Sequence, residues 1–217
     1  MPESMLAVKD LHAWYGESHV LHGVNFAVNH GEVVTLLGRN GVGKTTTMKS
    51  IMGMVGRRAG SIAFEGTETI ALQRKRGASF DFWRSQRVLE ELDGRARELI
   101  TAVGLADYET AIAVELPYGR KRALEIATTL ALDPEMMLLD EPTAGMTHED
   151  VERITQLIKT VAQGRTVLMV EHNMSVVSGI SDTITVLQRG SILAEGPYSE
   201  VSRDPQVMEA YMGTEHA

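Results

Sequence analysis

One short segment carries the residue types that can hold a phosphate group. Residues 38–45 read Gly-Arg-Asn-Gly-Val-Gly-Lys-Thr and fit the pattern G-x-x-x-x-G-K-T. Glycines allow successive backbone N–H groups to turn inward as an anion-binding nest, because no Cβ blocks the phosphates. The Lys44 ammonium suits the β- and γ-phosphates of a nucleotide, and the Thr45 hydroxyl suits Mg²⁺. The spacing therefore predicts a nucleotide-binding loop.

The surroundings of this loop support the prediction. A buried-strand pattern at residues 33–37 enters the loop, and a helical pattern follows it to about residue 54. That helix would aim its positive N-terminal end at bound phosphates. The alternative is a glycine-rich turn that contains Lys-Thr by chance, and the strand–loop–helix context argues against it. The predicted nucleotide-binding residues here are Gly38, Arg39, Asn40, Gly41, Val42, Gly43, Lys44, Thr45 and Thr46.

Two adjacent carboxylates form a second candidate for chemistry. Residues 136–139 (Met-Met-Leu-Leu) predict a short buried strand, which ends on Asp140 and Glu141. Asp140 can hold Mg²⁺, usually through water, and Glu141 can accept a proton from an attacking water. The alternative is a pair of acids that caps a strand–turn junction. The phosphate-binding loop earlier in the chain favours the catalytic interpretation.

The elements that must position these residues alternate along the chain. Strand patterns occur at residues 6–8, 20–28, 33–37, 61–64, 69–71, 136–139, 166–170, 183–187 and 191–194. Helical patterns follow the loop, occur at about 88–103 and 120–132, and run from a capping-box-like start at Thr147 to Gly164. Strands that alternate with helices predict an α/β domain built on a mostly parallel sheet.

The composition limits the classes of function. A chain of 217 residues fits one domain with a sizeable core, and a net charge of −8 gives it no electrostatic reason to bind nucleic acid. The absence of cysteine excludes disulfides and thiolate metal sites and agrees with a reducing cytoplasm. The beginning of the sequence has no signal-peptide pattern, and no stretch approaches the ~20 apolar residues of a membrane-spanning helix. Work at a membrane would therefore need partners that span it.

Further motifs follow in the order found in the ATP-binding subunits of ABC transporters, and the chain resembles that family. Val-Glu-His-Asn at 170–173 looks like the H-loop, in which His172 would reach the γ-phosphate; a lone histidine there would more often be structural. Tyr15 stands where the family places an aromatic ring that stacks on adenine, with core packing as the alternative. Residues 116–120 (Leu-Pro-Tyr-Gly-Arg) take the place of the signature, a helix start that contacts ATP held by the other subunit.

The signature departs from the family pattern. Tyr118 and Gly119 fit it, and Gly119 keeps the close backbone approach that the contact needs. Pro117 replaces the family's serine, so one hydroxyl donor to phosphate is lost, and Arg120 replaces the usual glutamine. Residues 144–147 likewise lack the aspartate usual in the D-loop.

The resemblance covers nearly the whole chain and is closest to the ATPases of branched-chain (hydrophobic) amino-acid importers. It implies a P-loop NTPase core with an N-terminal antiparallel β subdomain. It also implies one ABC-type domain over 1–217, with a shortened helical subdomain at about 74–132. Urea and short-amide importers belong to the same branch, so the cargo rests on resemblance alone.

The middle of the chain is short for this branch. Gly119 follows Lys44 by only 75 residues. The family has a Q-loop and the first part of the helical lobe in this stretch, but Gln73 comes too early and Gln86 stands in what looks like a helix start. Our hypothesis is an internal deletion or a junction between two related subunits at 74–77. The alternative is a naturally compact variant.

The resemblance implies a subunit that binds and hydrolyses ATP with Mg²⁺, in which Glu141 and His172 are catalytic and Thr45 and Asp140 hold the metal. Its partners would be transmembrane permease subunits, a second ATP-binding subunit and, indirectly, a periplasmic or extracellular substrate-binding protein. Its place would be cytoplasmic, on the inner face of the plasma membrane. The alternative is an impaired subunit that binds nucleotide without coupling. A soluble ABC-type protein that acts on DNA or ribosomes fits poorly, because the chain is acidic and lacks a basic insertion.

Overall fold

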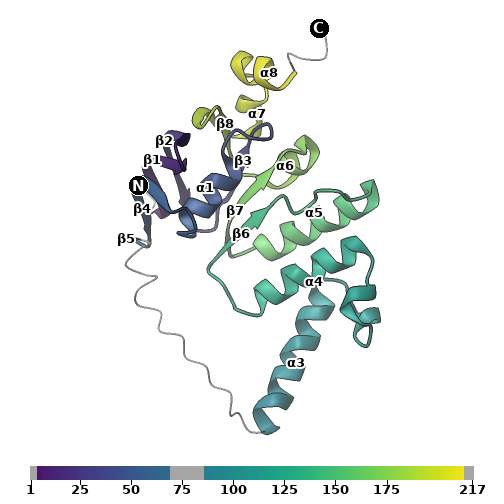
Figure 1. The fold of residues 1–217 in the computed structure, drawn as a ribbon. Helices are drawn as coiled ribbons and strands as arrows, with labels where there is room; N and C mark the ends of the chain where they lie inside the picture. The colour runs from purple at the N-terminus through teal and green to yellow at the C-terminus, as the bar shows by residue number, and fades with distance from the viewer. Residues whose placement is uncertain (1–3, 69–85, 213–217) are drawn as a thin grey trace.

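A computed structural model of the chain describes residues 4–68 and 86–212 (Figure 1). The predicted strand at 69–71, Gln73 and the suggested junction at 74–77 lie outside the described residues. No helix in the described ranges is long and apolar enough to cross a membrane.

The N-terminal part forms an antiparallel sheet with the strand order β2-β1-β4-β5. Its strands are β1 (Ser4–Tyr15), β2 (Ser18–Asn29), β4 (Arg57–Phe64) and β5 (Thr67–Glu68). Apolar side chains alternate along β1 and β2, so one face of the sheet is buried, as the period of two requires. The turn at 65–66 joins β4 to β5, and this hairpin starts its second strand earlier than the predicted 69–71.

The second sheet carries the candidate site and has the strand order β6-β7-β3-β8-β9. Its strands are β3 (Val33–Leu37), β6 (Met136–Asp140), β7 (Thr166–Glu171), β8 (Thr183–Gln188) and β9 (Ser191–Gly196). The first four are parallel, and β9 returns antiparallel to β8. Every residue of β3 and β7 is buried, as expected for the inner strands of a parallel sheet.

Helices cover this sheet and connect its strands (Figure 1). They are α1 (Lys44–Ile51), α3 (Gln86–Ala102), α4 (Tyr118–Leu130), α5 (His148–Ala162), α6 (Met174–Ile180), α7 (Tyr198–Val201) and α8 (Pro205–Met212). Two 3₁₀ turns, Ala106–Tyr108 and Ala113–Glu115, lie between α3 and α4. The Thr147 hydroxyl caps α5 by accepting a bond from the Asp150 N–H, and Gly164 follows the helix in the left-handed conformation.

The predicted α/β core, with its mostly parallel sheet and N-terminal antiparallel sheet, is confirmed. The apolar side chains of α4 and α5 pack on β6 and β7 in one cluster, and a second cluster fills the space among the two sheets and α1. Because β3, β6 and β7 are parallel neighbours, their carboxyl ends meet at one edge of the sheet. The phosphate-binding loop, the two carboxylates and His172 all follow those ends.

Candidate active site

The loop between β3 and α1 needs its glycines for two reasons. Gly41 and Gly43 have φ angles of 83° and 111°, in the left-handed region that other residues rarely adopt. A Cβ on Gly43 would stand 2.5 Å from a Leu21 methyl group, and one on Gly38 would stand 2.7 Å from the Leu187 carbonyl oxygen. At Gly38 and Gly43 the loop therefore packs against its neighbours by backbone alone, and Gly43 is the N-cap residue of α1.

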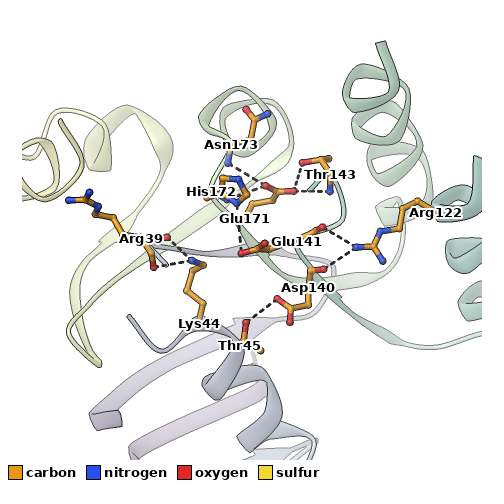
Figure 2. Close-up of polar contacts among 11 residues, drawn as sticks. Arg39, Lys44, Thr45, Arg122, Asp140, Glu141, Thr143, Glu171, His172 and Asn173 are labelled. Carbon is orange, nitrogen blue, oxygen red and sulfur yellow. Dashed lines mark hydrogen bonds and ion pairs between the residues drawn. The ribbon is translucent and has the colours of Figure 1, made fainter. Parts of the chain in front are cut away.

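Lys44 is the buried charge of this loop. The residue is only 4% exposed to solvent. Its Nζ donates hydrogen bonds to the carbonyl oxygens of Gly38 (2.6 Å) and Arg39 (3.2 Å). Burial lowers the pKa of the ammonium below its ordinary value, while three nearby carboxylates, those of Glu141, Asp140 and Glu171, oppose the shift. The Arg39 side chain points away from Lys44, so only its carbonyl takes part (Figure 2).

A cavity of about 310 Å³ opens beside Lys44. It is lined by Asn40, Gly41, Gly43, Lys44, Thr45, Thr46 and Glu141. Glycine backbone, a lysine and the first turn of a helix make this cavity suited to the phosphates of a nucleotide. Val42 lies just outside it, where its carbonyl accepts a bond from the Gly190 N–H (3.0 Å) and its side chain packs on the core.

Thr45 and Asp140 are brought together although they lie 95 residues apart. The Thr45 hydroxyl donates to Asp140 Oδ1 at 3.5 Å, across the junction of α1 and β6 (Figure 2). A hydroxyl and a carboxylate at the rim of a phosphate cavity are oxygen ligands of the kind that Mg²⁺ takes together with phosphate and water. The described residues hold no cluster of three or more histidine, cysteine or carboxylate side chains for a metal. The pair therefore fits a metal that the nucleotide itself helps to bind.

Glu141 and His172 face each other beside the cavity. Glu141 Oε1 lies 3.8 Å from His172 Nδ1, and both side chains are partly exposed (Figure 2). Glu141 has φ = 45°, a left-handed backbone for a non-glycine residue, and its N–H donates to the Val170 carbonyl at 2.9 Å. This bend turns the chain out of the sheet directly after β6 and brings the carboxylate to the cavity wall.

Glu171 lies inside the motif at 170–173, but the sequence alone assigns no role to it. It is 0% exposed; Oε1 accepts bonds from the Thr143 hydroxyl (2.6 Å) and N–H (3.2 Å), and Oε2 from the N–H groups of His172 (3.1 Å) and Asn173 (3.3 Å). These bonds hold the loop of His172 against the turn that follows Glu141. The signal for Glu171 in the sequence is an acid that ends an otherwise apolar strand.

Tyr15 lies at the end of β1 and is 48% exposed. This exposure argues against core packing as the reason for the tyrosine. The neighbouring Trp14 is engaged elsewhere: its ring stacks on His19 with 4.4 Å between centroids. Tyr15 thus presents an available aromatic ring at the end of β1, an inner strand of the antiparallel sheet.

Tyr118 and Gly119 start α4 and are not among the residues that line the phosphate cavity. Tyr118 is exposed, and Gly119 is buried against the Asp150 side chain. A Cβ on Gly119 would stand 2.6 Å from Asp150 Cγ and Oδ1, so only glycine fits this contact. Pro117 precedes the helix without a side-chain cap, and its carbonyl oxygen accepts bonds from the N–H groups of Arg120 (2.9 Å) and Lys121 (3.0 Å).

Comparisons with known proteins identify the family of the chain. Residues 21–144 match the family described as "ABC transporter", and residues 191–217 match one described as "Branched-chain amino acid ATP-binding cassette transporter". The octopine permease ATP-binding protein P of Rhizobium radiobacter is 31% identical over 237 aligned positions, covering 92% of this chain and 90% of the relative. The methionine import ATP-binding protein MetN of Rhizobium johnstonii is 31% identical, covering 94% of this chain and 64% of the relative.

Solved structures match over almost the whole chain. An ATP-binding cassette of an ABC transporter in its ADP conformation has a TM-score of 0.80 at 23% identity, with 97% of this chain and 99% of that chain covered. A nucleotide-free ATP-binding cassette has a TM-score of 0.81 at 24% identity, with 96% and 99% covered. The similarity to these two structures establishes the fold, and the sequence matches establish membership of the family. Since the fold, the loop and the sequence relatives agree, the chain belongs to the ABC transporter family, and it is an ATPase of that family that uses ATP and Mg²⁺.

Proposed function

We propose that this chain is the ATP-hydrolysing subunit of an importer and that it drives the uptake of branched-chain or other hydrophobic amino acids. The observation that carries the catalytic part is the approach of Glu141 to His172, 3.8 Å apart, at the wall of the cavity that Lys44 and Thr45 also line. A phosphate-binding cavity with a carboxylate and a histidine at its wall suits the attack of water on a γ-phosphate.

Each side chain has a proposed role. Backbone N–H groups of residues 38–46 and the Lys44 ammonium bind the phosphates, and Tyr15 stacks on the adenine. Mg²⁺, held by Thr45 and Asp140, would neutralise charge on the phosphate oxygens. Glu141 accepts the proton of the attacking water, and His172 donates a hydrogen bond to the γ-phosphate. Catalysis by such a site consists mainly of positioning and electrostatic stabilisation.

Two such subunits would complete the site. Tyr118 and Gly119 lie at the start of α4 and do not line the cavity of their own subunit, so their proposed contact is with ATP held by a second subunit, identical or related. The helix start would offer that phosphate the N–H groups of Tyr118 and Gly119, and Arg120 stands in place of the family's glutamine. Transmembrane permease subunits and an external substrate-binding protein would complete the assembly at the inner face of the plasma membrane.

The cargo is proposed from the sequence relatives. Relatives that cover almost the whole chain are named for octopine and methionine transport, so amino acids and their derivatives are the expected class. Residues 191–217, which include β9, α7 and α8, match a branched-chain amino-acid transporter family. This match favours branched-chain amino acids as the cargo within that class. Urea or short amides remain a second candidate on resemblance alone.

We also propose that residues 1–217 form one ABC-type domain whose helical part, about 74–132, is shortened. The alignment with the octopine relative runs over 237 positions although this chain has 217 residues, so the chain lacks residues that the relative has. A shortened lobe would affect docking to the permease more than the phosphate site. The competing function is therefore a subunit that binds nucleotide and does not couple its hydrolysis to transport.

Steady-state ATP hydrolysis tests the catalytic proposal. We expect the purified protein to hydrolyse ATP and Glu141→Gln to lose on the order of a hundredfold or more in kcat, because the proton acceptor is removed. Glu152→Gln is the control, since Glu152 is exposed on α5. ATP affinity, measured by fluorescence with a labelled nucleotide, should change little in Glu141→Gln. If the wild-type protein and Glu141→Gln bind ATP and are equally inert, the chain is a binding module.

A further inference from the structure

Arg122 joins the helix that starts with the signature to the backbone around Glu141. Its Nη2 donates to the carbonyl oxygens of Asp140 (3.2 Å) and Glu141 (3.0 Å), and its Nε donates to that of Pro142 (3.1 Å). One guanidinium thus binds three successive peptide groups, and Figure 2 shows its bonds to Asp140 and Glu141. These are the groups at which the chain leaves β6 and turns toward the cavity.

The backbone conformation at Glu141 is unfavourable unless neighbouring groups hold it. Glu141 is a non-glycine residue with φ = 45°, a conformation that persists where the surroundings hold it. Its N–H donates to the Val170 carbonyl, and its own carbonyl accepts bonds from Arg122 (3.0 Å) and from the Ala144 N–H (3.1 Å). The orientation of the Glu141 carboxylate follows from this backbone, since side-chain direction depends on φ and ψ.

We propose that Arg122 is a positioning residue for ATP hydrolysis, because its three bonds to the backbone of residues 140–142 set the direction of the Glu141 carboxylate. This inference rests on the proposed role of Glu141. The planar guanidinium suits the task, since its N–H groups form a rigid fork that one lysine ammonium cannot reproduce. Arg122 does not touch the nucleotide cavity; it acts through Glu141.

Arg122 lies on the same helix as Tyr118 and Gly119, the residues proposed to contact ATP in a second subunit. Gly119, at the start of α4, lies one turn before Arg122 on the same helix. A shift of α4 would therefore move the donor of all three bonds. Arg122 therefore connects Glu141 to the helix start whose proposed contact is with ATP in a second subunit.

A simpler role for Arg122 is the ion pair with Glu125, in which Nη1 lies 2.5 Å from Oε2. Glu125 is mostly exposed, and exposed pairs of this kind contribute little to stability. The two roles separate by mutation. Glu125→Gln removes the ion pair and leaves the bonds to the backbone, so we expect its kcat to stay within about twofold of wild type.

The first test compares Arg122→Lys with Arg165→Lys. Arg165 is a matched control, because its side chain is 28% exposed against 27% for Arg122 and it also binds a carboxylate (Asp133) and a backbone carbonyl (Val161). We expect Arg122→Lys to lower kcat by on the order of tenfold to a hundredfold, with KM for ATP within about twofold, since misplacement by ~1 Å can cost that much. Arg165→Lys should leave both constants near wild type.

The second test is chemical rescue of Arg122→Ala by guanidinium chloride at low millimolar concentration. The space vacated beside Glu125, Leu138 and Pro142 adjoins an existing cavity of about 130 Å³. Free guanidinium that restores the bonds to the backbone should raise kcat at least fivefold, and it should do nothing for Arg165→Ala. Rescue shows that the variant is folded and that the missing group is the guanidinium.

The outcomes separate this inference from the proposed function. A wild-type protein that binds ATP without hydrolysing it would overturn both. Wild-type hydrolysis together with an unchanged kcat in Arg122→Lys and Arg122→Ala would overturn the positioning role alone. An equal loss of ATP affinity and kcat, without rescue by guanidinium, would also overturn it, because that pattern indicates a general structural role.

Discussion

The Thr143 hydroxyl donates a 2.6 Å hydrogen bond to the buried carboxylate of Glu171, across 28 residues of sequence (Figure 2). Thr143 belongs to the turn after Glu141, and Glu171 ends the strand that leads to His172. One carboxylate therefore fixes the two loops that carry the proposed proton acceptor and the proposed phosphate ligand. The distance between Glu141 and His172 depends on this contact between their neighbours.

Removing the Thr143 hydroxyl should destabilise the fold. Thr143→Val keeps the shape of the side chain but deprives a buried carboxylate oxygen of a donor, so we expect the free energy of unfolding to fall by about 1–3 kcal/mol. Urea unfolding followed by circular dichroism measures the loss. Thr160→Val is the control, because the exposed Thr160 hydroxyl bonds only to the Gln156 carbonyl of its own helix. Equal losses in the two variants would contradict the prediction.

The buried ammonium of Lys44 should make stability depend on pH. Burial lowers its pKa in the folded protein below the ordinary value of about 10.4 that applies in the unfolded chain. At a pH between these two pKa values, the lysine is more protonated in the unfolded chain than in the folded protein. This group therefore makes the free energy of unfolding rise with pH as the pH approaches 10.4 from below. Lys44→Met should remove that part of the rise.

Urea unfolding of the nucleotide-free protein between pH 8 and pH 10, a range set by the ordinary lysine pKa, measures this effect. Lys49→Met is the matched control, since Lys49 lies on the same helix and is exposed. A pH dependence in Lys44→Met identical to that of wild type would show that burial does not shift the lysine. In the same variant, ATP affinity should fall by tenfold or more, because the phosphates lose a positive charge.

The Mg²⁺ concentration that hydrolysis requires should depend on the Asp140 carboxylate. Asp140→Asn replaces a charged oxygen ligand by a neutral one, so we expect the Mg²⁺ concentration for half-maximal hydrolysis to rise on the order of tenfold. A Mg²⁺ titration of ATPase activity measures this constant, and EDTA should abolish the activity. Asp133→Asn controls for charge, because Asp133 is exposed and pairs with Arg165. An unchanged titration curve in Asp140→Asn would exclude this carboxylate as a ligand.

The ring of Tyr15 should contribute to nucleotide affinity. Stacking of an aromatic side chain on a base is worth about 1–3 kcal/mol, so Tyr15→Ala should weaken ATP binding by roughly fivefold to 150-fold. Tyr15→Phe keeps the ring and should bind within about twofold of wild type. Competition binding with a fluorescent ATP analogue measures all three proteins. If Tyr15→Ala binds as tightly as wild type, the exposed ring has another role.

The elements of the fold could be predicted from local pattern. Continuous apolar runs located β3, β6 and β7, and the capping residues of α5 located its start at Thr147 and its end before Gly164. The first strand was predicted too short, at 6–8 instead of Ser4–Tyr15. The charged pair at Lys9 and Asp10 breaks the apolar alternation there, and the pairing registers shift at the same point. A bulge of this kind changes the period of a strand without ending it.

The supporting residues of the site could not be predicted in the same way. The glycines, Lys44 and the carboxylates form motifs because their spacing along the chain is itself the requirement. Glu171 and Arg122 act through partners on other elements, Thr143 at one position and residues 140–142 at the other. Their roles depend on the pairing of β7 with β6 and on the packing of α4, which no local pattern specifies.

The hydrogen-bond register of the parallel sheet sets the distances among the strand ends that carry the site residues. Leu37 pairs with Glu171, and Asp140 pairs with Val170, so the ends of three strands stay fixed relative to one another. The stretch between α1 and α4, residues 52–117, supplies none of the described side chains that line the phosphate cavity. The strand register that spaces Lys44, Glu141 and His172 does not pass through this stretch, although its residues Val103 and Leu105 pack with α4 in the core. A subunit of this family can therefore differ in this stretch and keep the strand-end spacing of its phosphate site.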